Sequence, residues 1–127
     1  MVLGDSTKSV PQYAREHPGK RCNLLSVDGG HVYSIAKQDI QNMAQLADPC
    51  CNVGLLDDTP MMAEVMRAFD ETRNAGLVCQ MHQLTSHVIA KTHLELAIDE
   101  TSSSQHLPPN RGVTVFHYMK SLRAAKS

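Results

Sequence analysis

Short apolar runs and longer amphipathic segments alternate along this chain. Leu24–Val27 and Asn52–Leu56 are apolar runs of strand length, and each stops at acidic residues. Apolar runs bounded in this way are typical of buried parallel strands. Between them, apolar side chains recur every three or four residues from Val32 to Ala47, which predicts a helix with one buried face. Pro49 then ends that helix.

Two further helices are predicted on either side of this strand–helix–strand unit. Residues 7–17 form the first of them. Thr59 followed by Pro60 predicts the start of the second, because a hydroxyl cap before a proline is a common helix N-terminus. Gly76 ends this helix. Its predicted buried stripe consists of Met62, Val65, Met66 and Phe69.

The rest of the chain contributes strands and one segment that the pattern does not assign. Leu77–Leu84 and Gly112–Phe116 are predicted strands. His87–Ile98 fits either a helix or a pair of strands, and Thr101–Asn110 is a polar, proline-containing loop. Together these elements predict one α/β domain that covers residues 1–127.

Composition narrows the class of protein. The 127 residues are 42% hydrophobic and 20% charged, which is typical of a globular chain. A formal net charge of −1 provides no basic surface for nucleic acid or for an anionic membrane. No apolar run is long enough to span a membrane, and the first 20 residues lack a signal-peptide core. We therefore expect a cytoplasmic protein with no nucleic-acid or membrane partner.

The four cysteines show no C-x-x-C spacing. Three of them, Cys22, Cys51 and Cys79, lie in or beside predicted strands. We interpret these three as small buried hydrophobic side chains in a reducing compartment.

Acidic residues follow both strands of the central unit. Asp28 and His31 come after the first strand, and Asp57 and Asp58 come directly after the second. Parallel strands end at one edge of a sheet, where open α/β folds bind ligands. Carboxylates are the ligands that Mg²⁺ and similar hard cations prefer, so Asp28, Asp57 and Asp58 predict a metal site. Two structural alternatives stay open, namely a simple turn at Asp28 and a helix-capping cluster at Asp57 and Asp58.

This arrangement, strand–DGGH-x-Y–helix–Pro–strand–DDT, resembles a known family. It is similar to the carboxyl-terminal half of class I S-adenosylmethionine-dependent methyltransferases, in the metal-dependent O-methyltransferase branch. Residues 2–6 resemble the end of that family's third strand, and Gly112–Met119 resembles its last strand. The resemblance implies a partial Rossmann-like, doubly wound sheet, mostly parallel with a last antiparallel strand, in a single truncated domain.

The resemblance also implies roles for individual residues. Asp28, Asp57 and Asp58 would bind Mg²⁺ or a similar divalent cation, and His31 would be the general base toward the hydroxyl of a small-molecule acceptor. Asp5 and Ser6 would contact the cofactor S-adenosylmethionine, with Asp5 accepting a hydrogen bond from its adenine amino group. A competing interpretation makes Asp5 an ordinary helix cap.

Two classes of function follow. The first is an O-methyltransferase that is truncated here or completed by a second chain, because the family's glycine-rich cofactor loop has no counterpart in this sequence. The second is a non-catalytic remnant that acts as a binding or interaction module. A Rossmann dehydrogenase is excluded, since no G-x-G-x-x-G follows any strand. A patatin-type hydrolase is excluded for lack of a G-x-S-x-G elbow.

The family's strand order, 3-2-1-4-5-7-6, has a further implication. Leu24–Val27 would normally pair with the family's first strand, which this sequence lacks. One edge of an apolar strand is then left without a neighbour, and no lysine or proline protects it. We expect Val2 and Leu3 to cover too little of this edge, so that a second copy or a complementing chain pairs there.

Overall fold

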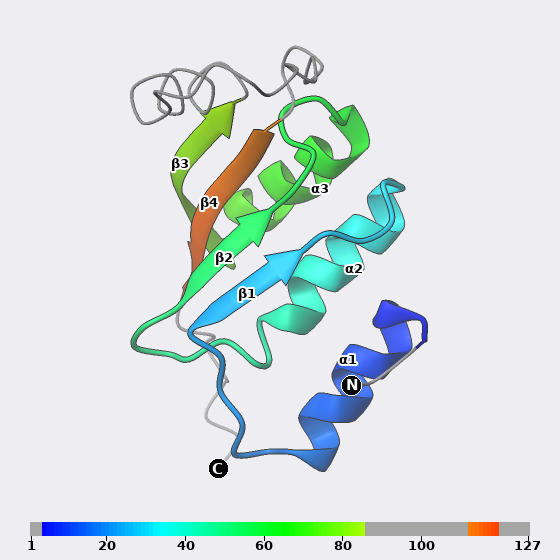
Figure 1. Cartoon of the computed structure of the whole chain (residues 1–127), viewed down its shortest axis with the longest axis vertical. Helices are drawn as coiled ribbons and strands as arrows, with labels where there is room; N and C mark the ends of the chain where they lie inside the picture. The colour runs from blue at the N-terminus through cyan, green and yellow to red at the C-terminus, as the bar shows by residue number, and fades with distance from the viewer. Residues whose placement is uncertain (1–3, 86–111, 120–127) are drawn as a thin grey trace, which may run out of the picture.

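A computed structural model describes residues 4–85 and 112–119. Within these ranges it has an α/β architecture with three helices and four strands, which confirms the α/β part of the predicted fold (Figure 1). In chain order the elements are α1 (Ser6–Glu16), β1 (Leu24–Val27), α2 (Tyr33–Met43), β2 (Val53–Leu56), α3 (Ala63–Asn74), β3 (Val78–Thr85) and β4 (Gly112–Tyr118). The predicted segments His87–Ile98 and Thr101–Asn110 lie outside the described residues, as do Val2 and Leu3.

The four strands form one open, mixed sheet in the order β1-β2-β4-β3. β1 and β2 pair in parallel, with Leu24 opposite Val53 and Val27 opposite Leu56. β4 is antiparallel to both of its neighbours, β2 and β3. Three strands therefore run in one direction and the last strand runs against them. Among the described residues β1 has a partner on one side only, as expected for an edge strand.

The core lies between the sheet and its helices. α2 and α3 lie against one face of the sheet, and α1 packs on α2 (Figure 1). Side chains on that face are buried, whereas Leu24, on the opposite face, is 65% exposed. Phe69 of α3 and Phe116 of β4 meet edge to face in the centre, with ring centroids 5.3 Å apart. Phe116 fits because Gly54 has no side chain: a Cβ there would lie 2.3 Å from the ring.

The predicted helix start at Thr59 and Pro60 is wrong. α3 begins at Ala63, and Met62 occupies the N-cap position without a side-chain cap. Thr59 is instead fully buried, and its hydroxyl accepts a hydrogen bond from the Thr114 hydroxyl at 2.8 Å. Its backbone N–H donates to the carbonyl of Gly112 at 3.0 Å. Contacts with β4 thus hold this threonine in the turn before the helix.

The predicted burial of the strand cysteines is also wrong. Cys51 and Cys79 are exposed, and Cys22 is only half-buried. Met81, in the same strand as Cys79, is 50% exposed. For Cys79 the physical reason is that a strand buries alternate side chains only, and the described helices cover one face of the sheet. Cys22 and Cys51 lie outside the strands. None of these helices has the length and apolar character needed to cross a membrane.

Candidate metal centre

The structure brings Asp28, Asp57 and Asp58 together at the carboxyl ends of β1 and β2. One carboxylate oxygen from each residue lies within 4.8 Å of the other two. The parallel register explains this proximity, because Val27 and Leu56 are partners and each is the last residue of its strand, so Asp28 and Asp57 follow side by side. We call these three residues the acidic cluster. Its first member is exposed, its second is half-buried and its third is buried.

The separations suit a single cation. Oxygens on opposite sides of Mg²⁺ are about 4.2 Å apart, since each Mg–O bond is roughly 2.1 Å long. For Ca²⁺ the corresponding separation is about 5 Å. Adjacent oxygens on Mg²⁺ are only about 3 Å apart, so from separations of up to 4.8 Å the side chains would rotate toward one another to bind an ion. The donor set, which consists entirely of carboxylate oxygens, favours such hard cations over softer metals.

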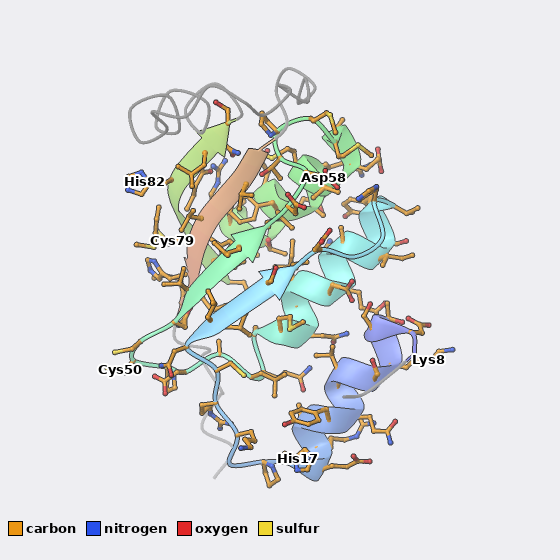
Figure 2. The ribbon with its side chains drawn as sticks, in the orientation of Figure 1. Lys8, His17, Cys50, Asp58, Cys79 and His82 are labelled. Atoms are coloured by element: carbon orange, nitrogen blue, oxygen red, sulfur yellow. The ribbon has the colours of Figure 1, made fainter. Side chains whose placement is uncertain are left out.

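His31 joins this group through Asp58. Its Nε2 lies 2.7 Å from the Asp58 Oδ2. The Asp58 side chain is only 9% exposed, whereas that of His31 is 49% exposed. Asp58 has a left-handed backbone conformation, with φ at 58°, which a non-glycine residue rarely adopts. Figure 2 shows Asp58 at one end of the sheet, far from Cys50 at the other.

The contact between His31 and Asp58 determines which imidazole nitrogen is available for chemistry. A neutral imidazole that donates from Nε2 to the carboxylate keeps its lone pair on Nδ1. Nδ1 is then the atom that can accept a proton from a ligand. Because half of the His31 side chain is exposed, a molecule from solvent can reach it.

A small pocket accompanies the acidic cluster. Its walls include the cluster, the loop from Gly29 to His31, and Asp39 from α2. The free space is about 10 Å³, which is roughly the room that one water molecule or ion needs. The pocket is therefore too small for an organic ligand and suits an ion.

Asp39 is a site residue that the sequence analysis missed. It is 3% exposed, and burial raises the pKa of its carboxyl group, although a hydrogen bond from the Ser6 hydroxyl at 3.0 Å partly opposes this effect. A signal was present in the sequence, because Asp39 occurs among the apolar positions of the helix, beside Ile40 and three residues after Ala36. An acidic side chain on the buried side of a helix is uncommon without a partner or a function.

The two predicted cofactor residues lie at the start of α1. Asp5 is the N-cap, and its carboxylate accepts hydrogen bonds from the Thr7 N–H at 3.0 Å and the Thr7 hydroxyl at 2.7 Å. These bonds lower the pKa of Asp5. This is the arrangement that the helix-cap interpretation predicts. Neither Asp5 nor Ser6 is among the described residues that line the pocket, and their contact with a cofactor stays a prediction.

Comparison with protein-family models, with curated proteins and with solved structures finds no match for this chain. Its function is therefore inferred from the geometry of the acidic cluster and its surroundings.

Proposed function

We propose that this chain binds a divalent cation at the acidic cluster and provides the metal and acceptor side of an S-adenosylmethionine-dependent O-methyl transfer site. The observation that carries the proposal is the convergence of three carboxylates from two adjacent strand ends, beside a histidine paired with one of them. The strand order β1-β2-β4-β3, with only β4 reversed, supports it further. It corresponds to the 4-5-7-6 part of the strand order in the resembled methyltransferases.

The chemistry follows from the positions of the residues. A divalent cation lowers the pKa of a hydroxyl that coordinates it. His31 would take the hydroxyl proton at Nδ1, while the Asp58 carboxylate would hold the imidazole in place through its contact with Nε2. Asp28, the exposed member of the cluster, leaves one side of the site open to a small-molecule acceptor.

Cation binding is tested directly by thermal denaturation in increasing Mg²⁺ or Mn²⁺. A ligand at 100 times its dissociation constant stabilises the folded state by about 2.7 kcal/mol, so a clear rise in Tm is expected. The double variant Asp57→Ala/Asp58→Ala should lose this rise. A matched double variant, Glu64→Ala/Asp70→Ala, removes two carboxylates from α3 outside the pocket and should keep it. Equal responses in both double variants would show that the cation effect is nonspecific.

The cofactor side is tested by calorimetry with S-adenosylmethionine. The glycine-rich loop that holds the cofactor in the resembled family has no counterpart in this sequence, so Asp5 and Ser6 alone should give at most millimolar affinity. Micromolar affinity that is lost in Asp5→Ala would place a complete cofactor site within this chain.

A binding or interaction module is the second candidate, and the exposed apolar side chains of the two edge strands favour it. Leu24 of β1 is 65% exposed, and Met81 and Leu84 of β3 are 50% and 38% exposed, where an edge strand can pair with another chain. This candidate predicts self-association without any specific response to cations. The two candidates are therefore separated by the same Mn²⁺ titration.

A further inference from the structure

Asp39 is the most deeply buried acidic residue in the described part of the chain, and half of its carboxylate is unsatisfied. Its Oδ2 accepts the hydrogen bond from Ser6. Its Oδ1 is buried and has no hydrogen-bond partner among the residues that the structure describes. Burying an unpartnered carboxylate oxygen is costly, and such groups in native proteins usually have a functional explanation.

The position of Asp39 connects it to the acidic cluster. It lines the same pocket as Asp28, Asp57 and Asp58. It also lies directly against the loop that carries His31, since a Cβ on Gly29 would be 2.7 Å from the Asp39 Oδ2. The free space in the pocket accommodates about one water molecule. The pocket thus lies between the acidic cluster, whose members range from exposed to buried, and the buried carboxylate of Asp39.

We propose that Asp39 is a positioning residue that accepts a hydrogen bond from a water molecule on the cation at the acidic cluster. This inference rests on the proposed cation site. Mg²⁺ usually retains several of its water ligands in proteins, and such waters need acceptors around them. Groups that hydrogen-bond to metal ligands commonly change metal affinity by 10- to 100-fold when they are replaced.

Ser6 gives the arrangement its rigidity. The Ser6 hydroxyl comes from the first turn of α1 and donates to Asp39 Oδ2 at 3.0 Å, while Oδ1 has no partner among the described residues. The bond joins residues 33 positions apart, so α1 is connected to the metal site through α2.

The decisive variant is Asp39→Asn, which keeps the size of the side chain and the bond to Ser6 but removes the charge. Mn²⁺ binding to the full chain is measured by the electron paramagnetic resonance signal of free Mn²⁺, and Tm is measured in EDTA. We expect the Mn²⁺ dissociation constant to rise about 10- to 100-fold. Without metal, Tm should stay the same or increase, because an unsatisfied buried carboxylate has been removed.

Asn42→Ala is the matched control. Asn42 is buried one turn further along α2, and its amide donates to the Thr7 carbonyl at 3.3 Å without lining the pocket. This variant should lower Tm and leave Mn²⁺ affinity unchanged. The inference is overturned if Asp39→Asn binds Mn²⁺ as the wild type does, or if its affinity and its metal-free Tm fall together. If the wild type itself does not bind Mn²⁺, the proposed function fails first, and the role of Asp39 fails with it.

Discussion

The left-handed backbone at Asp58 allows strain and chemistry to be separated at one position. Its φ of 58° costs a non-glycine residue roughly 1–3 kcal/mol, whereas glycine adopts this conformation freely. Asp58→Ala and Asp58→Gly both remove the carboxylate and its 2.7 Å contact with His31. They differ in whether the backbone strain remains and in the flexibility of the unfolded chain at this position. The fold therefore predicts that the glycine variant is the more stable of the two.

The size of the difference follows from two opposing effects. Relief of strain favours the glycine variant by roughly 1–3 kcal/mol, and the greater entropy of glycine in the unfolded chain opposes it by roughly 0.5–1 kcal/mol. A net difference of about 1 kcal/mol corresponds to roughly 3–5 °C in Tm for a domain of this size.

Thermal and urea denaturation in EDTA measure this difference, and Mn²⁺ should stabilise neither variant. If Asp58→Ala is as stable as Asp58→Gly or more so, the reasoning is refuted. That result would show that the left-handed backbone at position 58 carries no measurable strain, so no strain is needed to hold the carboxylate toward His31.

Two further predictions concern the rest of the fold. Hydrogen bonds from Lys37 and Tyr33 lower the pKa of Glu71 to about 2, from an ordinary value of 4.5. A lowered folded-state pKa contributes stability that is present above the unfolded value and is lost as pH falls toward 2. Glu71→Gln should therefore flatten the decline in Tm between about pH 5 and 2, and an unchanged decline would contradict the role of this network. At the edge of the sheet, Leu24 is 65% exposed, and β1 pairs with β2 alone among the described strands. Concentration-dependent self-association in light scattering is expected, with Leu24→Lys reducing it. A monomer at every concentration would refute the prediction.

Much of the fold could be predicted from local pattern. The strand Leu24–Val27 was predicted with its observed bounds, and Val53–Leu56 differs by one residue. Both runs are apolar and stop at acidic residues, so their ends are encoded locally. Because parallel neighbours end at one edge, the proximity of Asp28 to Asp57 and Asp58 also followed from sequence.

Tertiary contacts decided what local pattern could not. Thr59 precedes a proline, as residues that cap helices often do. It is nevertheless buried, because Thr114, 55 residues later, lies against it. Cys79 lies in a strand, yet it is exposed because the described helices cover only the opposite face of the sheet. In both cases side-chain burial is set by residues that are distant in sequence. The residues next to Thr59 or Cys79 in the chain therefore do not predict it.

The candidate site divides in the same way. The sequence predicted which carboxylates meet, because the strand ends are encoded locally and a strand–helix–strand connection favours parallel pairing. Only the folded chain determined that Asp58 turns inward onto His31, through a backbone conformation that its side chain does not favour. Only the folded chain placed Asp39 beneath Gly29, where helix packing buries one of its oxygens without a partner among the described residues. Packing between elements sets side-chain burial, and burial distinguishes these two carboxylates from the exposed Asp28.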